Sequence, residues 1–328
     1  MKGLLGRSLL VVVVLCLGGV GTLWVVPFGT EPSDALPLSA PQSSVARLEA
    51  PLPVLQLGAA PAQTLDAPGQ PAQPPPAPQP DPLAEWAAET APLIGVPEPA
   101  LINYGTADLI MQDREPDCRL SWITLAALGR AGSDQLQPEA GAPAAIATAE
   151  EMCSGGRNTT TDKGWESAVR SVGSDSAGDD TAHVHRVLAA ATAYAAALES
   201  GVPISAPARV AIDFAIDNIG LPYVWGGNGP NLGDAGFDCS GLTKAAYAAA
   251  GIELPRTAHT QYFGTRRVGP REPLQPGDLI FYGHPSIKIH HVGLYIGNGQ
   301  MINAPTFGMP VQVAAVGAGV TGAGRPVD

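Results

Sequence analysis

The sequence has few cysteines, few aromatic residues and few charges, and this composition limits the classes of protein to which the chain can belong. Only 5% of its 328 residues are aromatic and 15% are charged, although 45% are hydrophobic. The net charge is −12 and no long basic run occurs, so we expect no nucleic-acid binding. With only four cysteines, each one needs its own explanation. The length leaves room for two domains of ordinary size.

The N-terminal residues are typical of a membrane anchor. Residues 9–28 carry no charge and are long enough to cross a bilayer core of about 30 Å. Lys2 and Arg7 precede this run, so we expect residues 1–8 in the cytoplasm and the rest outside. A cleaved signal peptide is the alternative, but the run is long for one and no small-x-small cleavage site follows. The sequence therefore predicts a single-pass membrane protein with its folded domains in the cell wall.

Residues 29–84 are rich in proline, alanine and glutamine, which predicts a linker without a fold of its own. The segment "PAQPPPAPQPDP", residues 71–82, is typical of an extended polyproline II spacer. Such a spacer would hold the folded parts away from the membrane, which suits a substrate in the cell wall.

Residues 85–201 are predicted to form a helical domain. "SWITLAALGRAG" and "AHVHRVLAAATAYAAALESG" repeat apolar residues at a spacing of three and four, and no strand pattern interrupts them. Cys118 and Cys153 both fall in this region, and outside the cell they are free to oxidise. We expect them to form a disulfide worth roughly 2–4 kcal/mol.

Residues 206–328 are predicted to belong to the α+β class. A helical segment at 208–220 is followed by "CSGLTKAAYAAAG", whose start at Cys239 is marked by Asp238 as N-cap and whose end is marked by Gly251. The later segments "DLIFYG" and "HHVGLYIGNGQMINAP" are typical of antiparallel strands. Helices therefore come first and strands afterwards.

Cys239 stands where the positive end of a helix dipole can lower the pKa of its thiol. No second cysteine or close histidine has the spacing of a metal site, so we expect neither metal nor cofactor there. The alternative is that Cys239 is a small buried hydrophobic residue. A nucleophilic role would require a base and a group that orients the base.

The strand beginning at His290 offers that base. Residues alternate along it, so His291, Gly293 and Tyr295 share one face. The other face carries His290 and the apolar residues Val292, Leu294 and Ile296. His291 is therefore the better base, and Gly293 beside it should leave open space for a substrate.

Asn303, on the following strand, is the candidate third member. A two-residue turn at Asn298-Gly299 would place Asn303 opposite Leu294, on the wrong face. A three-residue loop, residues 297–299, would place it opposite Gly293, on the face of His291. The catalytic interpretation therefore predicts an odd loop or an equivalent bulge.

Together these residues resemble the NlpC-type cell-wall peptidases, a papain-like family. The resemblance rests on five motifs over about 100 residues: "LPYVWGG" (221–227), "FDCSGL" (237–242), "LPRTAHTQ" (254–261), "LQPGDLIFY" (274–282) and "HVGLYIGNGQMINAP" (291–305). It implies a papain-like fold in which Cys239 is the nucleophile, His291 the base and Asn303 the polar third member. Many members of the family carry histidine at the third position. Tyr223, Asp238 and Ser240 match its substrate-side positions.

The helical region resembles the lysozyme-like lytic transglycosylases of Gram-positive bacteria. The matching segments are "CRLSWITLAALGR" (118–130), "AAIATAEEMCSGGRNTTTDKGWESAV" (144–169) and "HRVLAAATAYA" (185–195). The Glu-Ser-Gly of that family, whose glutamate is the general acid, is replaced here by Gly132-Ser133-Asp134. The departure predicts a degenerate transglycosylase fold that serves as a spacer, wall-binding module or partner surface.

The resemblance implies a peptidoglycan hydrolase that cleaves stem peptides, typically between D-glutamate and a diamino acid. Two alternatives stay open. One is a non-catalytic membrane-anchored wall scaffold, for example in a secretion or conjugation apparatus. The other is an amidase or acyltransferase on the same fold, which would share the acyl-enzyme step.

Overall fold

The computed structural model describes residue 52 and residues 81–133, 136–173 and 180–326. All of these residues belong to one compact unit within residues 35–328. The predicted anchor over residues 9–28 lies outside them, as does most of the predicted linker over residues 29–84. None of the helices formed by the described residues is both long and apolar enough to span a bilayer.

The described residues before Ala206 form helices, and no strand occurs among them, as the sequence predicts. Asp81 caps the first helix by accepting a hydrogen bond from the backbone N–H of Leu83 at 2.9 Å, and Gly95 ends it in a left-handed conformation. The helices are α1 (Pro82–Ile94), α2 (Glu98–Arg114), α3 (Trp122–Arg130), α4 (Gly141–Cys153), α5 (Asp162–Ser171) and α6 (Asp180–Ser200). A short 3-10 turn, η2 (Pro138–Ala140), precedes α4.

The predicted disulfide is present. Cys118, which lies before α3, is bonded to Cys153 at the end of α4, with the two Cα atoms 5.5 Å apart. Both cysteines belong to the hydrophobic core. The bond therefore fixes the helical part from within.

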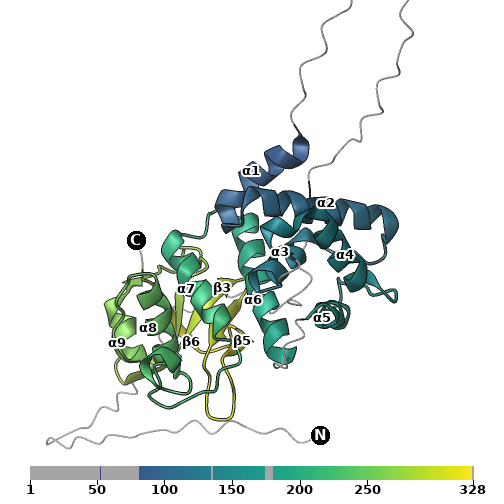
Figure 1. Cartoon of the computed structure of the whole chain (residues 1–328). Coiled ribbons are helices and arrows are strands. Elements are labelled where there is room, and N and C mark those ends of the chain that lie inside the picture. Colours follow the sequence, from purple (N-terminus) through teal and green to yellow (C-terminus); the bar gives the residue numbers. More distant parts are fainter. Residues whose placement is uncertain (1–51, 53–80, 134–135, 174–179, 327–328) are drawn as a thin grey trace, which may run out of the picture. The chain divides into compact units, whose positions relative to one another are not determined.

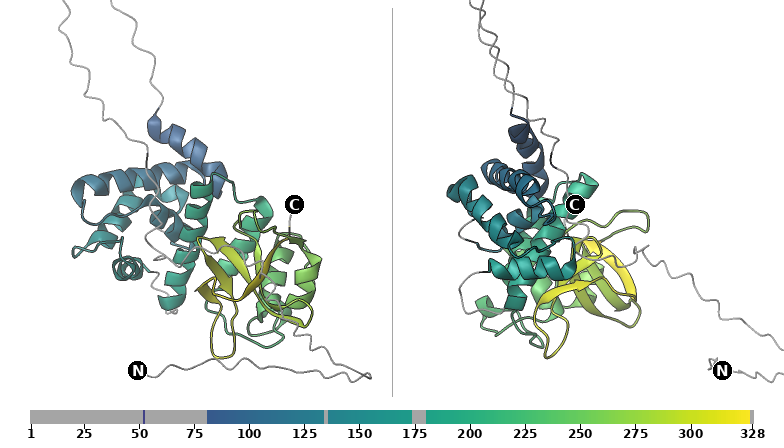
Figure 2. Two further views of the ribbon diagram at one scale, coloured as in Figure 1. Left: turned by 180° about the vertical axis from the view of Figure 1, so that it is seen from behind. Right: turned by 90° about the vertical axis from the view of Figure 1, so that its right-hand side faces the viewer.

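Helix α6 is the element that joins the helical part to the sheet (Figures 1 and 2). It packs against α1, α3, α5 and α7, and also against strands β3 and β5. Its alanine-rich middle, residues 189–193, is buried on all sides. Small side chains on every face let neighbouring elements approach the helix closely, and a helix that is apolar all round is typically buried.

The remaining described residues form three helices and one antiparallel sheet, as predicted for this part. The helices are α7 (Ala206–Asp217), α8 (Cys239–Ala249) and α9 (Ala258–Gly264), with a short 3-10 turn, η3 (Pro230–Leu232), before α8. The strands are β1 (Arg266–Arg267), β2 (Leu279–His284), β3 (Lys288–Gly297), β4 (Gln300–Asn303), β5 (Gln312–Ala315) and β6 (Val320–Arg325). Their order in the sheet is β1-β6-β2-β3-β4-β5.

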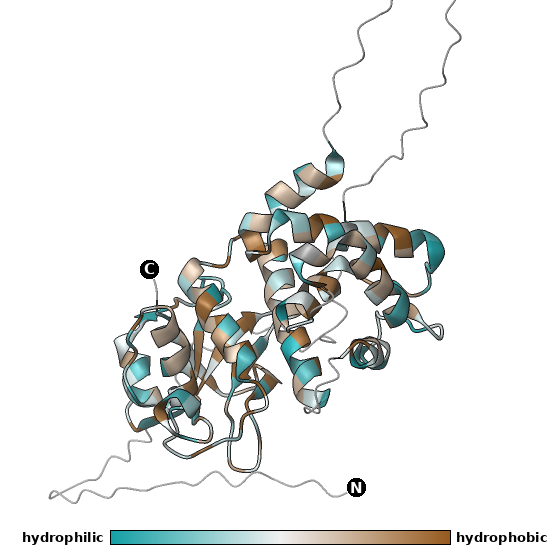
Figure 3. Ribbon diagram, in the orientation of Figure 1, coloured by the Kyte–Doolittle hydropathy of each residue, from teal (hydrophilic) through white to brown (hydrophobic). Residues whose placement is uncertain are grey.

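Strand β3 lies in the middle of the sheet and is buried on both faces. The predicted apolar face is buried: Val292, Leu294 and Ile296 join the main core beneath the helices. The other face is also covered, because Tyr295 packs with Ile280 and Met301 in a second, smaller cluster. Figure 3 shows the hydrophobic colouring that this central position requires.

The space beside Gly293 is filled, which corrects the expectation that it stays open for a substrate. A Cβ atom at Gly293 would lie 2.5 Å from the Met301 sulfur and 3.4 Å from the Asn303 Cβ. The glycine is required because these two side chains of β4 approach the backbone of β3.

The hairpin between β3 and β4 contains a bulge that sets the register of the two strands. Gly297 pairs with Gln300, so the turn itself consists of two residues and not of the three expected. The register then shifts between Tyr295 and Gly297, and Leu294 pairs with Ile302. The extra residue has the effect of an odd loop and returns Asn303 to the face of His291.

Candidate active site

Cys239 is the first residue of α8, where the sequence places it. Asp238 precedes the helix in an extended conformation, and its Oδ1 accepts a hydrogen bond from the backbone N–H of Gly241 at 2.6 Å. Among the described cysteines, Cys239 is the one that forms no disulfide, and it is half-buried. The helix therefore begins with an accessible thiol.

The thiol lies against the backbone of β3 at residues 290–292. The Cys239 Sγ is 3.9 Å from the carbonyl oxygen of His290, and it accepts from the backbone N–H of Val292. Strand β4 pairs with β3 only from Leu294 onward, so the sulfur meets the strand before that pairing begins. The geometry thus brings the thiol to the strand segment that carries His291.

Among the described residues, the Cys239 sulfur contacts the backbone of β3 and forms no hydrogen bond with the His291 ring. The His291 imidazole is half-buried: its ring centroid lies 5.8 Å from that of Tyr282, and it forms a hydrogen bond with the Asn303 side chain.

 Tyr282 and Asn303 therefore hold the imidazole on one face of the sheet.

Asn303 lies at the end of β4 and is only 2% exposed. Its side chain contributes a hydrogen bond to His291, while its amide Nδ2 has no partner among the described residues. The amide oxygen is therefore the atom that accepts from the imidazole N–H. Of the predicted residues, His291 and Asn303 are in direct contact, and Cys239 lies beside them.

The charges at the site differ from the expected ones. Burial raises the pKa of the Cys239 thiol, and the negative charge of Asp238 raises it further. The backbone N–H groups of Val292 and Ser240 act in the opposite direction but do not prevail. The start of α8 thus lowers this pKa through the Ser240 N–H, as the sequence predicts, but burial and the charge of Asp238 outweigh it and the net shift is upward.

The pKa of His291 is shifted downward. Burial is the largest cause, the neighbouring His290 is the second, and the hydrogen bond with Asn303 acts against both. The imidazole is thus neutral at pH 7 and able to accept a proton. The site combines a protonated thiol with a neutral base, which is suited to general-base activation of the sulfur.

Tyr223 also lies beside the thiol. Burial raises the pKa of its hydroxyl, and the charges of Cys239 and Asp238 raise it further. Its backbone N–H donates to the carbonyl of Met309 at 3.2 Å, which ties it to the loop after β4. The structure therefore places this predicted substrate-side residue at the rim of the site.

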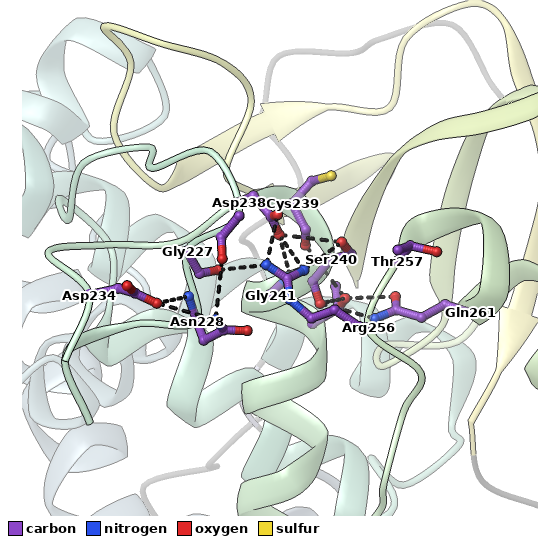
Figure 4. A network of polar contacts seen from close by, with 12 residues as sticks. Gly227, Asn228, Asp234, Asp238, Cys239, Ser240, Gly241, Arg256, Thr257 and Gln261 are labelled. Carbon is purple, nitrogen blue, oxygen red and sulfur yellow. Dashed lines mark hydrogen bonds and ion pairs between the residues drawn. The ribbon is translucent and has the colours of Figure 1, made fainter. Parts of the chain in front are cut away.

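Asp238 and Ser240 belong to a polar network around Arg256 (Figure 4). The Arg256 guanidinium donates to both carboxylate oxygens of Asp238, at 2.9 and 2.8 Å, and to the Ser240 Oγ at 3.1 Å. Figure 4 shows the Cys239 sulfur directed away from this network. Asp238 and Ser240 therefore hold the start of α8 in place in addition to any contact with substrate.

Arg256 and Gln261 are functional-site residues that sequence reasoning did not single out. Gln261 is fully buried, donates to the backbone carbonyls of Ser240 and Pro255 at 3.0 Å each, and accepts from Thr243 at 2.8 Å. Both residues lie in the motif "LPRTAHTQ". Arg256 is half-buried just before α9 and Gln261 is buried within it, and their place in this motif is the signal that could have identified them.

A metal centre is not formed by the described residues, in which no three His, Cys, Asp or Glu side chains are grouped to hold an ion.

Residues 220–321 match the NlpC/P60 family. This NlpC/P60 domain contains Cys239, His291 and Asn303. It begins just after α7 and includes the described strands of the sheet except the end of β6.

Curated relatives resemble the same part of the chain. The "Probable endopeptidase p60" of Listeria monocytogenes is 51% identical over 92 residues, which are 28% of this chain and 18% of that protein. The "Bifunctional muramidase/DL-endopeptidase CwlT" of Bacillus subtilis is 41% identical over 112 residues, 31% of this chain and 33% of that protein. The "Peptidoglycan endopeptidase RipB" of Mycobacterium tuberculosis is 42% identical over 124 residues. That match covers 34% of this chain and 50% of RipB, so the chain spans half or less of these relatives.

A solved structure resembles the same part. The peptidoglycan hydrolase RipB from Mycobacterium tuberculosis matches with a TM-score of 0.34 and 37% identity, over 37% of this chain and 65% of that one.

Proposed function

We propose that this chain hydrolyses stem peptides of peptidoglycan, with Cys239 as nucleophile, His291 as general base and Asn303 as the residue that orients the imidazole. The observation that carries the proposal is the meeting of three elements: the thiol at the start of α8, the imidazole on β3 and the amide at the end of β4. The name of RipB, a peptidoglycan endopeptidase, supports the substrate class, and that of p60, a probable endopeptidase, supports the reaction.

The first half of the reaction forms a thioester. The Cys239 side chain turns from the His290 carbonyl toward the imidazole, and His291 takes the thiol proton as the sulfur attacks the amide carbon. Backbone N–H groups at the start of α8 and the Tyr223 hydroxyl stabilise the oxyanion. His291 then gives the proton to the leaving amine, the C–N bond breaks, and the acyl group remains on sulfur.

The second half restores the enzyme. His291 takes a proton from water, and the resulting hydroxide attacks the thioester carbon. The C–S bond breaks, the carboxylic acid leaves, and the proton returns to Cys239. Each step uses the neutral imidazole that the lowered pKa of His291 provides.

The test is digestion of purified peptidoglycan with residues 81–328, with product masses read out. We expect new amino and carboxyl termini within stem peptides, no new glycan ends, and loss of both products in Cys239→Ala and His291→Ala. His284→Ala, which changes an exposed histidine of the same sheet, should keep the activity. An unaltered digest would favour the scaffold, the non-catalytic alternative.

An acyl-transfer function on the same fold would leave a different product. Added glycine amide would then appear on the released carboxyl group in preference to water. Release of the free acid in the presence of the amine supports the hydrolase.

We also propose that the helical part over residues 85–201 has no transglycosylase activity, and that residues 9–28 anchor the chain in the membrane. Support for the first is Gly132-Ser133-Asp134 in place of a catalytic glutamate, and for the second the uncharged run itself. Anhydro-sugar ends in the digest of Cys239→Ala would contradict the first. Release of the full-length chain from membranes by salt alone would contradict the second.

A further inference from the structure

Two large aromatic side chains beside the site are exposed. Trp225 is 73% and Phe307 67% exposed, and they lie next to each other. Removal of an aromatic ring from water is favourable, so two adjacent rings left exposed indicate a binding surface.

The ring geometry leaves their faces accessible. The planes of Trp225 and Phe307 are 12° apart, but their centroids are 6.4 Å apart, well beyond the roughly 3.5–4 Å of atoms in direct contact. The rings are therefore offset. Tyr223 meets Phe307 edge to face, at 5.1 Å and 69°. These three residues, Tyr223, Trp225 and Phe307, form what we call the aromatic wall.

Backbone hydrogen bonds hold the wall in place. The Val311 N–H donates to Leu221 at 2.8 Å, and the Tyr223 N–H donates to Met309 at 3.2 Å, so the two loops that carry the wall are joined. The Val224 N–H donates to Phe237 at 2.9 Å, just before Cys239. The wall is thus fixed relative to the thiol.

The wall suits a neutral ligand with an apolar face. Neither residues 221–226 nor residues 304–309 include a charged side chain. The C–H face of a pyranose is apolar and its rim carries hydroxyl groups, which matches exposed rings in a polar surrounding.

The position of the wall also fits the proposed substrate. His291 protonates the leaving amine, so the acyl part of the stem peptide, which leads to the glycan, lies on the remaining side of the thiol. Tyr223 also borders the thiol. Two extended residues between the scissile bond and the glycan span about 7 Å. The Phe307 ring lies 5.1 Å from the ring of Tyr223, centroid to centroid, and 6.4 Å from that of Trp225.

We propose that the aromatic wall binds a sugar ring of the glycan strand, so that glycan-linked stem peptides are preferred over free ones. This inference rests on the proposed function. It assigns Trp225 and Phe307 to substrate selection and not to the chemical step.

The test compares kcat/KM for a disaccharide-linked tripeptide with kcat/KM for the same tripeptide without sugar. We expect the protein to prefer the linked form by about tenfold, the effect of one stacking contact. Trp225→Ala and Phe307→Ala should lower this ratio to about two or less, chiefly through a higher KM for the linked form. Phe307→Tyr keeps the ring face and should keep the ratio. The matched control is Phe263→Ala, which removes a ring that is 64% exposed on α9 and should leave the ratio unchanged.

Two outcomes separate this inference from the proposed function. Equal turnover of both substrates, or an unchanged ratio in Trp225→Ala, would overturn the inference and leave the peptidase intact. Cleavage of neither substrate would overturn the proposed function. In that case binding is measured with the disaccharide alone, titrated into Cys239→Ala. The sugar should still quench the fluorescence of the exposed Trp225, and this quenching should be absent when Trp225→Ala is titrated in the same way. Absence of quenching would overturn the inference as well.

Discussion

At the scale of single residues, the two candidate reactive groups, the Cys239 thiol and the His291 imidazole, are both uncharged. The pKa of Cys239 lies above and that of His291 below the ordinary values, so thiolate and imidazolium are both disfavoured at rest. Burial is the first cause of both shifts, because a low-dielectric surrounding penalises either charge. In the proposed mechanism, the thiol therefore keeps its proton until substrate binds.

The neutral base predicts a characteristic pH dependence. Activity requires unprotonated His291 and should fall on the acid side with a midpoint below 6.5, the ordinary pKa of histidine. His290→Gln removes a positive neighbour, so the pKa of His291 rises and the midpoint moves to higher pH. The measurement is kcat/KM against pH on a stem peptide. A midpoint that stays in place in this variant would mean that His290 does not act on the base.

Asn303 should matter through the position of the imidazole. Asn303→Ala removes the hydrogen bond that raises the pKa of His291, so the acidic midpoint should move to lower pH. The ring also loses its orientation, and kcat/KM should fall on the order of 10²-fold. Asn231→Ala, a change at an exposed asparagine in η3, is the control. An unchanged rate in Asn303→Ala would reduce the site to a Cys239–His291 dyad.

At the scale of elements, the start of α8 is fixed by Arg256, whose guanidinium donates to both carboxylate oxygens of Asp238. Arg256 neutralises Asp238, whose side chain is only 15% exposed and also caps the helix. Glycines let the neighbouring loop approach this helix end: a Cβ at Gly241 would lie 2.0 Å from the Gly227 carbonyl oxygen. The thiol is therefore positioned by a polar network on one side and close backbone packing on the other.

Replacing Arg256 tests that network. Lysine cannot reproduce the two-pronged contact, and Arg256→Met leaves Asp238 without its partner. We expect the free energy of unfolding to fall by about 1–3 kcal/mol in Arg256→Met. Urea denaturation would show this as a lower midpoint with an unchanged slope. Arg271→Met, at an exposed position, should have no such effect.

The elements also show which features the sequence could predict. The cysteine helix and the central hairpin have local signals: Asp238 at the cap, and alternation from Val292 to Ile296. Strand β6, "VTGAGR", does not, because two glycines weaken its strand pattern and its pairing with β2 is distant in sequence. The bulge near Ile296 and the filling of the space beside Gly293 by Met301 depend on packing between strands, which no local pattern specifies.

At the scale of the whole molecule, the helical part and the NlpC/P60 domain share a core through α6. A polar contact also joins the helical part to α7, which precedes that domain: Arg130 on α3 binds Asp213 at 2.5 Å and Asp217 at 3.0 Å. These surface ion pairs contribute little individually. The apolar packing of α6 on β3 and β5 is the larger link, and it makes the helical part a structural support for the strand that carries His291.

The two parts approach each other closely at Gly297, the last residue of β3. A Cβ there would lie 2.2 Å from the Cβ of Ala196 on α6, and the residue has a φ of +106°. Gly297→Ala therefore combines overpacking with backbone strain and should destabilise the protein by about 2–5 kcal/mol.

Gly299→Ala provides the matched control. Gly299 also has a positive φ, +72°, but its Cβ would meet nothing within 4 Å, so this variant carries the strain without the overlap. The double variant Gly297→Ala/Ala196→Gly removes the overlapping Cβ and should recover part of the loss, although glycine weakens α6 by about 1 kcal/mol. Thermal and urea unfolding of residues 81–328 measure all four proteins. Equal losses in Gly297→Ala and Gly299→Ala would show that α6 does not support β3 in solution, and His291 would then be held by the sheet alone.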